Sequence, residues 1–255
     1  ASDVYKRQTY MSVLTNEQKV EILSEIVAIP SVNDNELAVA QYLAQWLNQY
    51  DIDTHIDYIS GQRANLIATI GSGKPVVAVS GHMDVVNEGN HDDWTSPPFE
   101  LTERNGHLYG RGAADMKSGL AALVIAMIEI KASGQLKNGT IKLLATAGEE
   151  MEQAGSEQLY RKGYMDDVDA LVIAEPSYPS IVYAHKGSMD IKITSKGRSS
   201  HSSTPFMGEN AITPLIELIQ NINQAYEDIT QSIKGTALDL SLIHISEPTR
   251  QAEIS

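Results

Sequence analysis

Residues 75–84 have the sequence PVVAVSGHMD, in which an apolar run is followed by His82 and Asp84. Apolar and β-branched residues over this length predict a buried β-strand. The same order, an apolar run that ends in carboxylates, recurs in residues 141–150 (IKLLATAGEE) and residues 171–176 (LVIAEP). Because these strand patterns alternate with helical ones, the sequence predicts a layered α/β domain.

The carboxyl ends of the three predicted strands carry the candidate functional residues. In open α/β sheets, ligands bind outside these strand ends. A glycine-rich turn, GRGAADMK at residues 110–117, adds Asp115 to the same expected crevice. Several ionised carboxylates cannot share a crevice without a compensating cation, so the sequence predicts a metal site. The candidates are His82, Asp84, Asp115, Glu149, Glu150 and Glu175.

The combination of these residues is more informative than any one of them. A single acid after a strand is more often a solvated loop residue than a ligand. Asp84, however, lies two residues from His82, where it can hydrogen-bond the imidazole and fix its tautomer, as metal-bound histidines generally require. If the backbone is extended at Glu149 and Glu150, their side chains point to opposite faces, so that one can bind metal while the other faces a water.

Motifs spread over the chain resemble the M20 family of di-zinc amidohydrolases. They are GHMDVV at 81–86, DWTSPPF at 93–99, YGRGAADMKSG at 109–119 and GRSSHSSTP at 197–205. Glu149, Glu150 and Glu175 also fall where that family keeps its next ligands. Together these segments cover most of residues 15–215. The resemblance implies a three-layer α/β zinc-hydrolase catalytic domain, followed by the first part of an inserted α+β lid or dimerisation domain.

The resemblance also implies a set of metal ligands. His82 and Glu175 would bind the first zinc, and Asp115 would bridge both ions. Glu150 would bind the second zinc, together with a histidine from a later segment that this chain is expected to lack. Two zinc ions per complete subunit are therefore expected, although the carboxylate-rich ligand set would also accept cobalt or manganese. A cis peptide bond between Asp115 and Met116 is implied as well.

Three residues are expected to act beside the metal ions. By resemblance, Glu149 is the general base that takes a proton from a metal-bridging water, and Asp84 orients His82. A histidine in a serine-rich loop is usually a surface residue, but His201 lies in the lid motif of the family. The resemblance implies that it reaches the active site of the partner subunit in a homodimer and stabilises the oxyanion.

The two ends of the chain are expected to lie outside the folded protein. Residues 1–8 and 240–255 resemble the translated adapters of a transposase-made sequencing library, because their back-translations contain an inverted repeat. We therefore expect the N-terminal part of the catalytic domain at residues 9–183 and a partial lid at residues 184–239. The chain would then be a C-terminally truncated fragment, inactive alone, that binds one metal appreciably and the second weakly.

Composition narrows the class of protein. The 255 residues include 19 Lys and Arg against 33 Asp and Glu, a net charge of −14. This balance argues against nucleic acid and anionic membrane surfaces as partners. There is no cysteine, no apolar stretch long enough to cross a bilayer, and no hydrophobic leader after Met11, so a cytoplasmic protein is expected.

Local patterns predict the individual elements. Thr15 can cap a first helix that ends before Pro30. The other expected elements are a helix at 37–47, a hairpin of strands 53–59 and 64–70, a helix at 116–130 opened by Asp115 and ended near Gly134, a strand at 189–194 and a helix at 210–226.

The expected reaction is the hydrolysis of the amide of an N-acylated amino acid. The motifs at 93–99 and 109–119 are most similar to the succinyl-diaminopimelate desuccinylase branch of the family, with acetylornithine deacetylases and broader acylases or peptidases as alternatives. Glu175 favours a deacylase over a peptidase. An alternative of another class is a catalytically silent metal-binding scaffold, which could lose the base Glu149. The acyl group and the amino acid stay open.

Overall fold

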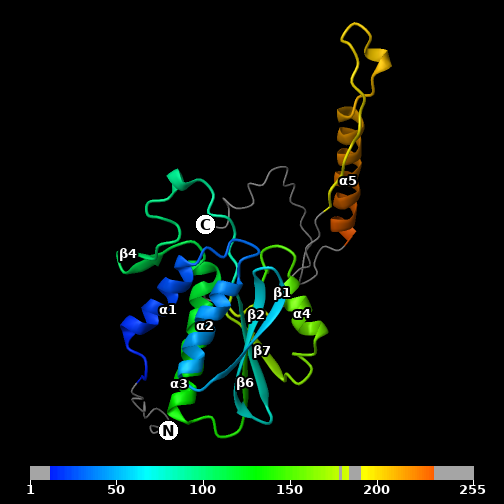
Figure 1. Ribbon diagram of the computed structural model, residues 1–255. Coiled ribbons are helices and arrows are strands. Elements are labelled where there is room, and N and C mark those ends of the chain that lie inside the picture. The colour runs from blue at the N-terminus through cyan, green and yellow to red at the C-terminus, as the bar shows by residue number, and fades with distance from the viewer. Residues whose placement is uncertain (1–11, 178–179, 184–190, 233–255) are drawn as a thin grey trace. The chain divides into compact units, whose positions relative to one another are not determined.

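The computed structural model describes residues 12–177, 180–183 and 191–232. These residues fall into two compact units that divide between Pro176 and Ser177 (Figure 1). The domain boundary predicted between residues 183 and 184 adjoins residues outside these ranges, and it stays a prediction. The expected adapter tails, residues 1–8 and 240–255, also lie outside the described residues.

The first unit is built on a five-stranded sheet with the strand order β1-β2-β6-β3-β7. Its strands are β1 (Asp53–Ser60), β2 (Arg63–Ser72), β3 (Val76–His82), β6 (Gly139–Thr146) and β7 (Ala170–Ile173). Strands β1, β2 and β6 are antiparallel neighbours, whereas β6, β3 and β7 run parallel. His82 pairs with Thr146, so the residues that follow the parallel strands meet at one edge of the sheet.

Helices cover both faces of this sheet (Figure 1). On one face lie α1 (Asn16–Ala28), α2 (Leu37–Gln49) and α3 (Ser118–Ser133), and on the other lies α4 (Ala154–Arg161). Alternate residues of β2 point to opposite layers: Leu66 and Ala68 belong to the larger hydrophobic cluster, and Ile67 belongs to a smaller cluster with Leu159 of α4. The predicted three-layer α/β fold is therefore confirmed.

The first helix begins where the sequence predicts. The Thr15 hydroxyl accepts a hydrogen bond from the backbone N–H of Gln18, and the Gln18 side chain accepts one from the N–H of Thr15. This capping box satisfies two donors that a helix start otherwise leaves free. The second helix and the β1–β2 hairpin are confirmed as well, with each element one to three residues longer than predicted.

The helix predicted at 116–130 begins later than expected. Residues Ala113–Lys117 form an irregular π-type turn, and α3 starts at Ser118 and ends before Gly134. Met116 has φ −131° and ψ 31°, outside the helical region, so the helix cannot begin at this residue. The expected cis peptide bond between Asp115 and Met116 is present in this turn.

Short elements complete the first unit, and one helix dominates the second. A 3₁₀ turn at His91–Asp93 precedes a small hairpin of β4 (Thr102–Arg104) and β5 (His107–Tyr109). The second unit contains a 3₁₀ turn at Pro205–Met207 and the predicted helix, observed as α5 (Ile212–Ser232).

The strand predicted at 189–194 is wrong for residues 191–194, and its first two residues, 189–190, lie outside the described residues. Residues 191–194 have no regular structure, and Ile191 and Ile193 are exposed. Within the described part of this unit, Arg198 and Glu209 form a single isolated bridge. An apolar alternation without a neighbouring strand leaves its backbone groups unpaired, which explains the difference.

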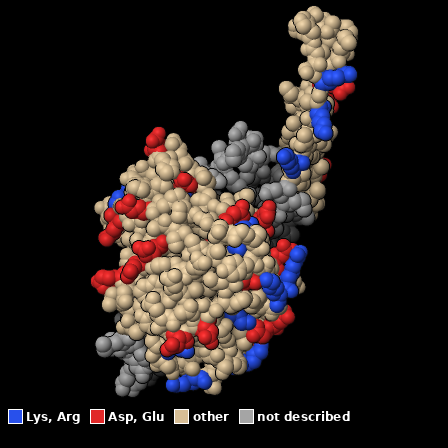
Figure 2. All heavy atoms as spheres, in the orientation of Figure 1, with Lys and Arg blue, Asp and Glu red and all other residues tan. Residues whose placement is uncertain are grey.

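Acidic side chains are interspersed with basic ones over the face shown in Figure 2. Among the described residues, no helix is both long and apolar enough to cross a membrane. The expectation that nucleic acid and membrane surfaces are not partners stays a prediction.

Candidate metal centre

His82 is the centre of the candidate site. It is the last residue of β3 and is almost fully buried, with 2% of its surface exposed. Its Nδ1 lies 2.9 Å from the backbone oxygen of Asp84, a contact in which Nδ1–H donates. Its Nε2 therefore faces the acidic residues at the sheet edge, as metal-binding histidines are generally held.

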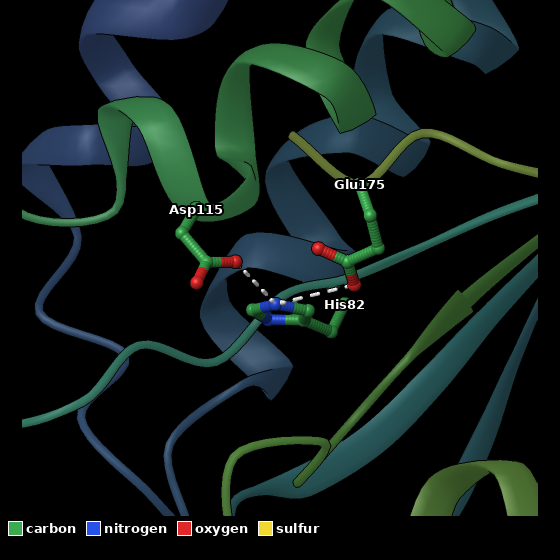
Figure 3. Close-up of side chains that lie close together, drawn as sticks. All are labelled: His82, Asp115 and Glu175. Carbon is green, nitrogen blue, oxygen red and sulfur yellow. Dashed lines mark hydrogen bonds and ion pairs between the residues drawn. The ribbon is translucent and has the colours of Figure 1, made fainter. Parts of the chain in front are cut away.

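The potential metal ligands form two clusters of residues, which we call the first and second carboxylate groups. The first carboxylate group comprises His82, Asp115 and Glu175 (Figure 3). One ligand atom from each residue lies within 4.8 Å of the other two. His82 Nε2 is 3.2 Å from Asp115 Oδ1 and 3.8 Å from Glu175 Oε1. Asp115 comes from the turn before α3, and Glu175 follows β7, so three separate elements supply this group.

The second carboxylate group comprises His82, Glu149 and Glu150, whose ligand atoms also lie within 4.8 Å of one another. Glu149 and Glu150 follow β6 in a turn, not in an extended segment, so their side chains do not diverge to opposite faces. Glu149 Oε2 is 4.0 Å from His82 Nε2, and the Glu149 side chain is 46% exposed. The structure thus brings together all of the expected ligands and the expected base, whose individual roles remain predictions.

Asp84 makes different contacts from those expected. Its backbone oxygen, not its carboxylate, accepts the hydrogen bond of His82 Nδ1, because Oδ1 is 3.7 Å from that nitrogen. The buried carboxylate instead accepts the backbone N–H of Glu149 at 3.1 Å and that of Glu150 at 3.0 Å. Asp84 therefore joins the end of β3 to the turn after β6.

The protonation of the site reflects crowded negative charge. Burial lowers the pKa of His82, but the hydrogen bond with Asp115 and the neighbouring carboxylates outweigh it and raise the pKa to about 9. Burial raises the pKa of Glu150 to about 7, and the charges of Asp115 and Glu149 add to this shift. Burial likewise raises the pKa of Glu175 to about 7. The hydrogen bond from His82 keeps the pKa of Asp115 low.

This set of side chains fits a divalent metal ion. The raised pKa values of Glu150 and Glu175 mean that nearby positive charges do not balance the carboxylates. A bound cation would supply this positive charge and stabilise their ionised forms. One imidazole nitrogen and several carboxylate oxygens are ligands that zinc accepts, and cobalt and manganese accept them too. The described residues therefore contain two overlapping groups that could hold metal ions.

Lys117 is an important residue that the sequence did not single out. It is completely buried, and its Nζ donates hydrogen bonds to the backbone oxygens of Ile26 at 2.6 Å and Ile29 at 2.9 Å. These carbonyls belong to the C-terminal end of α1, which helix geometry leaves without partners. Lys117 thus ties the turn that carries Asp115 to α1, and its position two residues after a candidate ligand was the available signal.

His201 belongs to the second unit. It is exposed, and its Nδ1 accepts hydrogen bonds from the Ser203 hydroxyl at 2.8 Å and the Ser203 N–H at 3.2 Å. Both of these local contacts are made by Nδ1. The role predicted for His201 at a partner subunit stays a prediction.

Comparison with known sequences identifies related proteins. The family model described as "Peptidase family M20/M25/M40" matches residues 78–251. A "Probable succinyl-diaminopimelate desuccinylase" from Staphylococcus epidermidis (strain RP62A) is 52% identical over 229 residues, which cover 90% of this chain and 56% of that protein. A protein of the same name from Staphylococcus aureus (strain MSSA476) is 50% identical over 231 residues, with coverages of 91% and 57%. The chain thus spans little more than half the length of these curated relatives.

Comparison with solved structures agrees with the fold. Human carnosine dipeptidase 1 is 29% identical, with a TM-score of 0.53 over 62% of this chain and 38% of that chain. A tripeptidase from Staphylococcus aureus gives a TM-score of 0.57 over 81% of this chain and 56% of that chain, and its 22% identity shows the fold alone.

Proposed function

Because the chain belongs to peptidase family M20/M25/M40, we propose that the full-length protein is a metal-dependent amidohydrolase that removes the acyl group from an N-acyl amino acid. The observation that carries this proposal is the pair of carboxylate groups that share His82. Glu149, a half-exposed member of the second group whose Oε2 lies 4.0 Å from His82 Nε2, is the proposed general base for the attacking water.

The residues of the site divide into ligands and a base. His82, Asp115 and Glu175, whose ligand atoms are grouped, would hold one metal ion. By the family resemblance, Asp115 and Glu150 would contribute to the second. When bound, the ions supply Lewis acidity that polarises the amide carbonyl and lowers the pKa of water. Glu149 takes a proton from the attacking water on a carboxylate oxygen and delivers it to the leaving amine. This transfer turns the amine into a good leaving group.

The proposed substrate is succinyl-diaminopimelate. Its support is that relatives sharing half of their residues with this chain are named as desuccinylases of this compound. Acetylornithine and dipeptides are the alternatives left by the motifs. A scaffold without catalysis is disfavoured because the proposed base Glu149 is present in the second group, next to His82.

Three further features complete the proposal. Zinc is the proposed metal, since nitrogen and carboxylate oxygen ligands suit it. The second unit is proposed to form a homodimer through which His201 reaches the partner's site and stabilises the oxyanion. The cytoplasm is the proposed location, in keeping with a biosynthetic small-molecule substrate.

Kinetic comparison of substrates tests this proposal. The full-length protein, loaded with zinc, is assayed against succinyl-diaminopimelate, acetylornithine and a dipeptide, and kcat/KM is compared across the three. We expect the first compound to have the highest value. A higher value for either of the others would replace the proposed substrate, and no hydrolysis of any amide by a correctly folded, zinc-loaded protein would favour the scaffold.

A further inference from the structure

A buried ion pair lies under the turn that carries Glu149 and Glu150. Glu36, at the start of α2, is completely buried, and its Oε1 lies 3.6 Å from Nε of Arg63. Arg63 begins β2, and its side chain is 11% exposed. Its Nη1 lies 2.9 Å from Oδ1 of Asp34, an exposed carboxylate.

Arg63 makes direct contact with the turn through Gly148. Gly148 has a φ of +72°, and a Cβ atom at this position would collide with Nη2 of Arg63. The guanidinium of Arg63 therefore occupies the space that a side chain at position 148 would fill. The backbone of Gly148, just before Glu149, packs against it. Glycine adopts this dihedral angle without strain, and any side chain at this position would have to displace the end of Arg63.

Two other polar side chains hold the same segment. Asn65, two residues along β2, accepts the N–H of Ala147 at 3.1 Å and donates to the oxygen of Gly155 at 3.1 Å. On the other side, the Asp84 carboxylate accepts the N–H groups of Glu149 and Glu150. The turn is thus held between β2 and the end of β3.

Stability alone does not explain a charged pair at this position. Burial raises the pKa of Glu36, and Arg63 opposes the shift. Neither carboxylate oxygen of Glu36 has a hydrogen-bond partner among the described residues, and neither do Nε and Nη2 of Arg63. Buried ion pairs replaced by apolar residues of similar volume are often as stable or more stable, so such a pair is weak evidence for a purely stabilising role.

We infer that Glu36 and Arg63 are positioning residues that set the geometry of the Glu149–Glu150 turn through contact with Gly148. The inference rests on the proposed function, because it concerns the same site. The turn supplies the second carboxylate group, whereas Asp115 and Glu175 of the first group come from other elements. Loss of the pair should therefore affect one metal ion and leave the other.

Metal titration of the full-length protein tests the inference. Zinc affinities are measured by competition calorimetry for the wild type, Arg63→Met and Glu36→Gln, with Arg161→Met as the matched control. Arg161 also pairs with a glutamate, Glu157, but lies exposed on α4. Loss of residues that support metal ligands typically costs about 10–100-fold in affinity or activity. We expect a loss of this size for the second ion in both variants at the ion pair, with the first ion and the control unchanged.

Kinetics and a double-mutant cycle separate positioning from general destabilisation. For the pair variants, kcat should fall about 10–100-fold with KM nearly unchanged, and Arg63→Lys should restore part of it. Gly148→Ala should weaken the second ion more in the wild type than in Arg63→Ala, where no guanidinium meets the added methyl.

Equal weakening of both ions, or unchanged affinity in folded Arg63→Met and Glu36→Gln variants, would overturn the inference. Should Arg63→Met not fold, Glu36→Gln alone decides, because it keeps the shape of the side chain. If the wild type binds two ions but hydrolyses no amide, the proposed function fails. Selective loss of the second ion would then still support positioning by the pair.

Discussion

The two carboxylate groups that share His82 are built in different ways. Asp115 and Glu175 come from separate elements and meet at His82 because the parallel strands and the turn before α3 end at the same edge. Glu149 and Glu150 are adjacent in one turn, so they are close because they are neighbours in sequence. The direction of their side chains depends on the hydrogen bonds that fix the turn. The first group therefore depends on the assembly of the whole sheet, and the second depends on a few local contacts.

The largest expected effect comes from the residue that the groups share. His82→Ala removes the proposed imidazole ligand of the first ion, beside which both groups are assembled, so zinc should be lost from that site and hydrolysis should become undetectable. Bound zinc per subunit, measured by atomic emission after dialysis, checks this. The control is His91→Ala, whose imidazole is exposed and pairs with Glu88. Retention of the wild-type zinc content by His82→Ala would show that His82 is not a metal ligand.

Glu149→Ala should separate catalysis from metal binding. General acid–base residues contribute about 10²–10⁴-fold, so kcat should fall by that range while both zinc ions remain. Steady-state kinetics together with zinc content measures the two effects. Glu152→Ala, an exposed acid in the same segment, should retain wild-type activity. Loss of the second zinc from Glu149→Ala would make Glu149 a ligand, in place of the proposed base.

Lys117→Met should destabilise the fold around the turn that carries Asp115 of the first group. Methionine keeps much of the volume but leaves the carbonyls of Ile26 and Ile29 without their donor. An unsatisfied buried acceptor costs about 1–3 kcal/mol, and the free energy of unfolding should fall by this amount in the metal-free protein. Urea unfolding measures it, with Lys131→Met on the exposed end of α3 as the control. An unchanged free energy of unfolding would mean that the carbonyls find other partners.

The smallest effect concerns the pH dependence of the metal-free protein. Folding raises the pKa of Glu150 and Glu175 from 4.5 to about 7 and that of His82 from 6.5 to about 9. The folded state therefore holds protons that the unfolded state releases. The stabilisation from the two glutamates is complete below about pH 4.5 and is lost as the pH rises through about 7. The stabilisation from His82 is complete below about pH 6.5 and is lost as the pH rises through about 9.

Thermal unfolding between pH 5 and pH 8 checks this sign. The melting temperature of the metal-free protein should fall more over this range than that of Glu175→Gln, which lacks one titrating group. Zinc should reverse the trend, because it binds the deprotonated ligands. The same slope for both proteins would show that Glu175 does not contribute.

The sequence predicted the elements and the residues of the site because both are local signals. Apolar runs that end in His82, Glu149 and Glu175 mark strand ends, and parallel strands bring such ends together. The Ile191–Thr194 segment shows the limit of this approach, because an alternating pattern does not specify a neighbouring strand.

The contacts that support the site could not be predicted in this way. Lys117 and its acceptor Ile26 are 91 positions apart, and neither has a local pattern that announces the contact. The same holds for Arg63 beneath Gly148. A buried charge depends on what surrounds it in three dimensions, whereas hydropathy patterns place charged residues at the surface.

Asp84 uses its main chain for one purpose and its side chain for another. The hydrogen bond from His82 Nδ1 is accepted by the backbone oxygen, which every amino acid possesses. The carboxylate instead accepts hydrogen bonds from the turn after β6. Protein engineers can therefore vary position 84 to adjust the turn and leave the histidine's orientation encoded in the backbone. The orientation of His82 and the conformation of the turn therefore depend on different parts of the same residue.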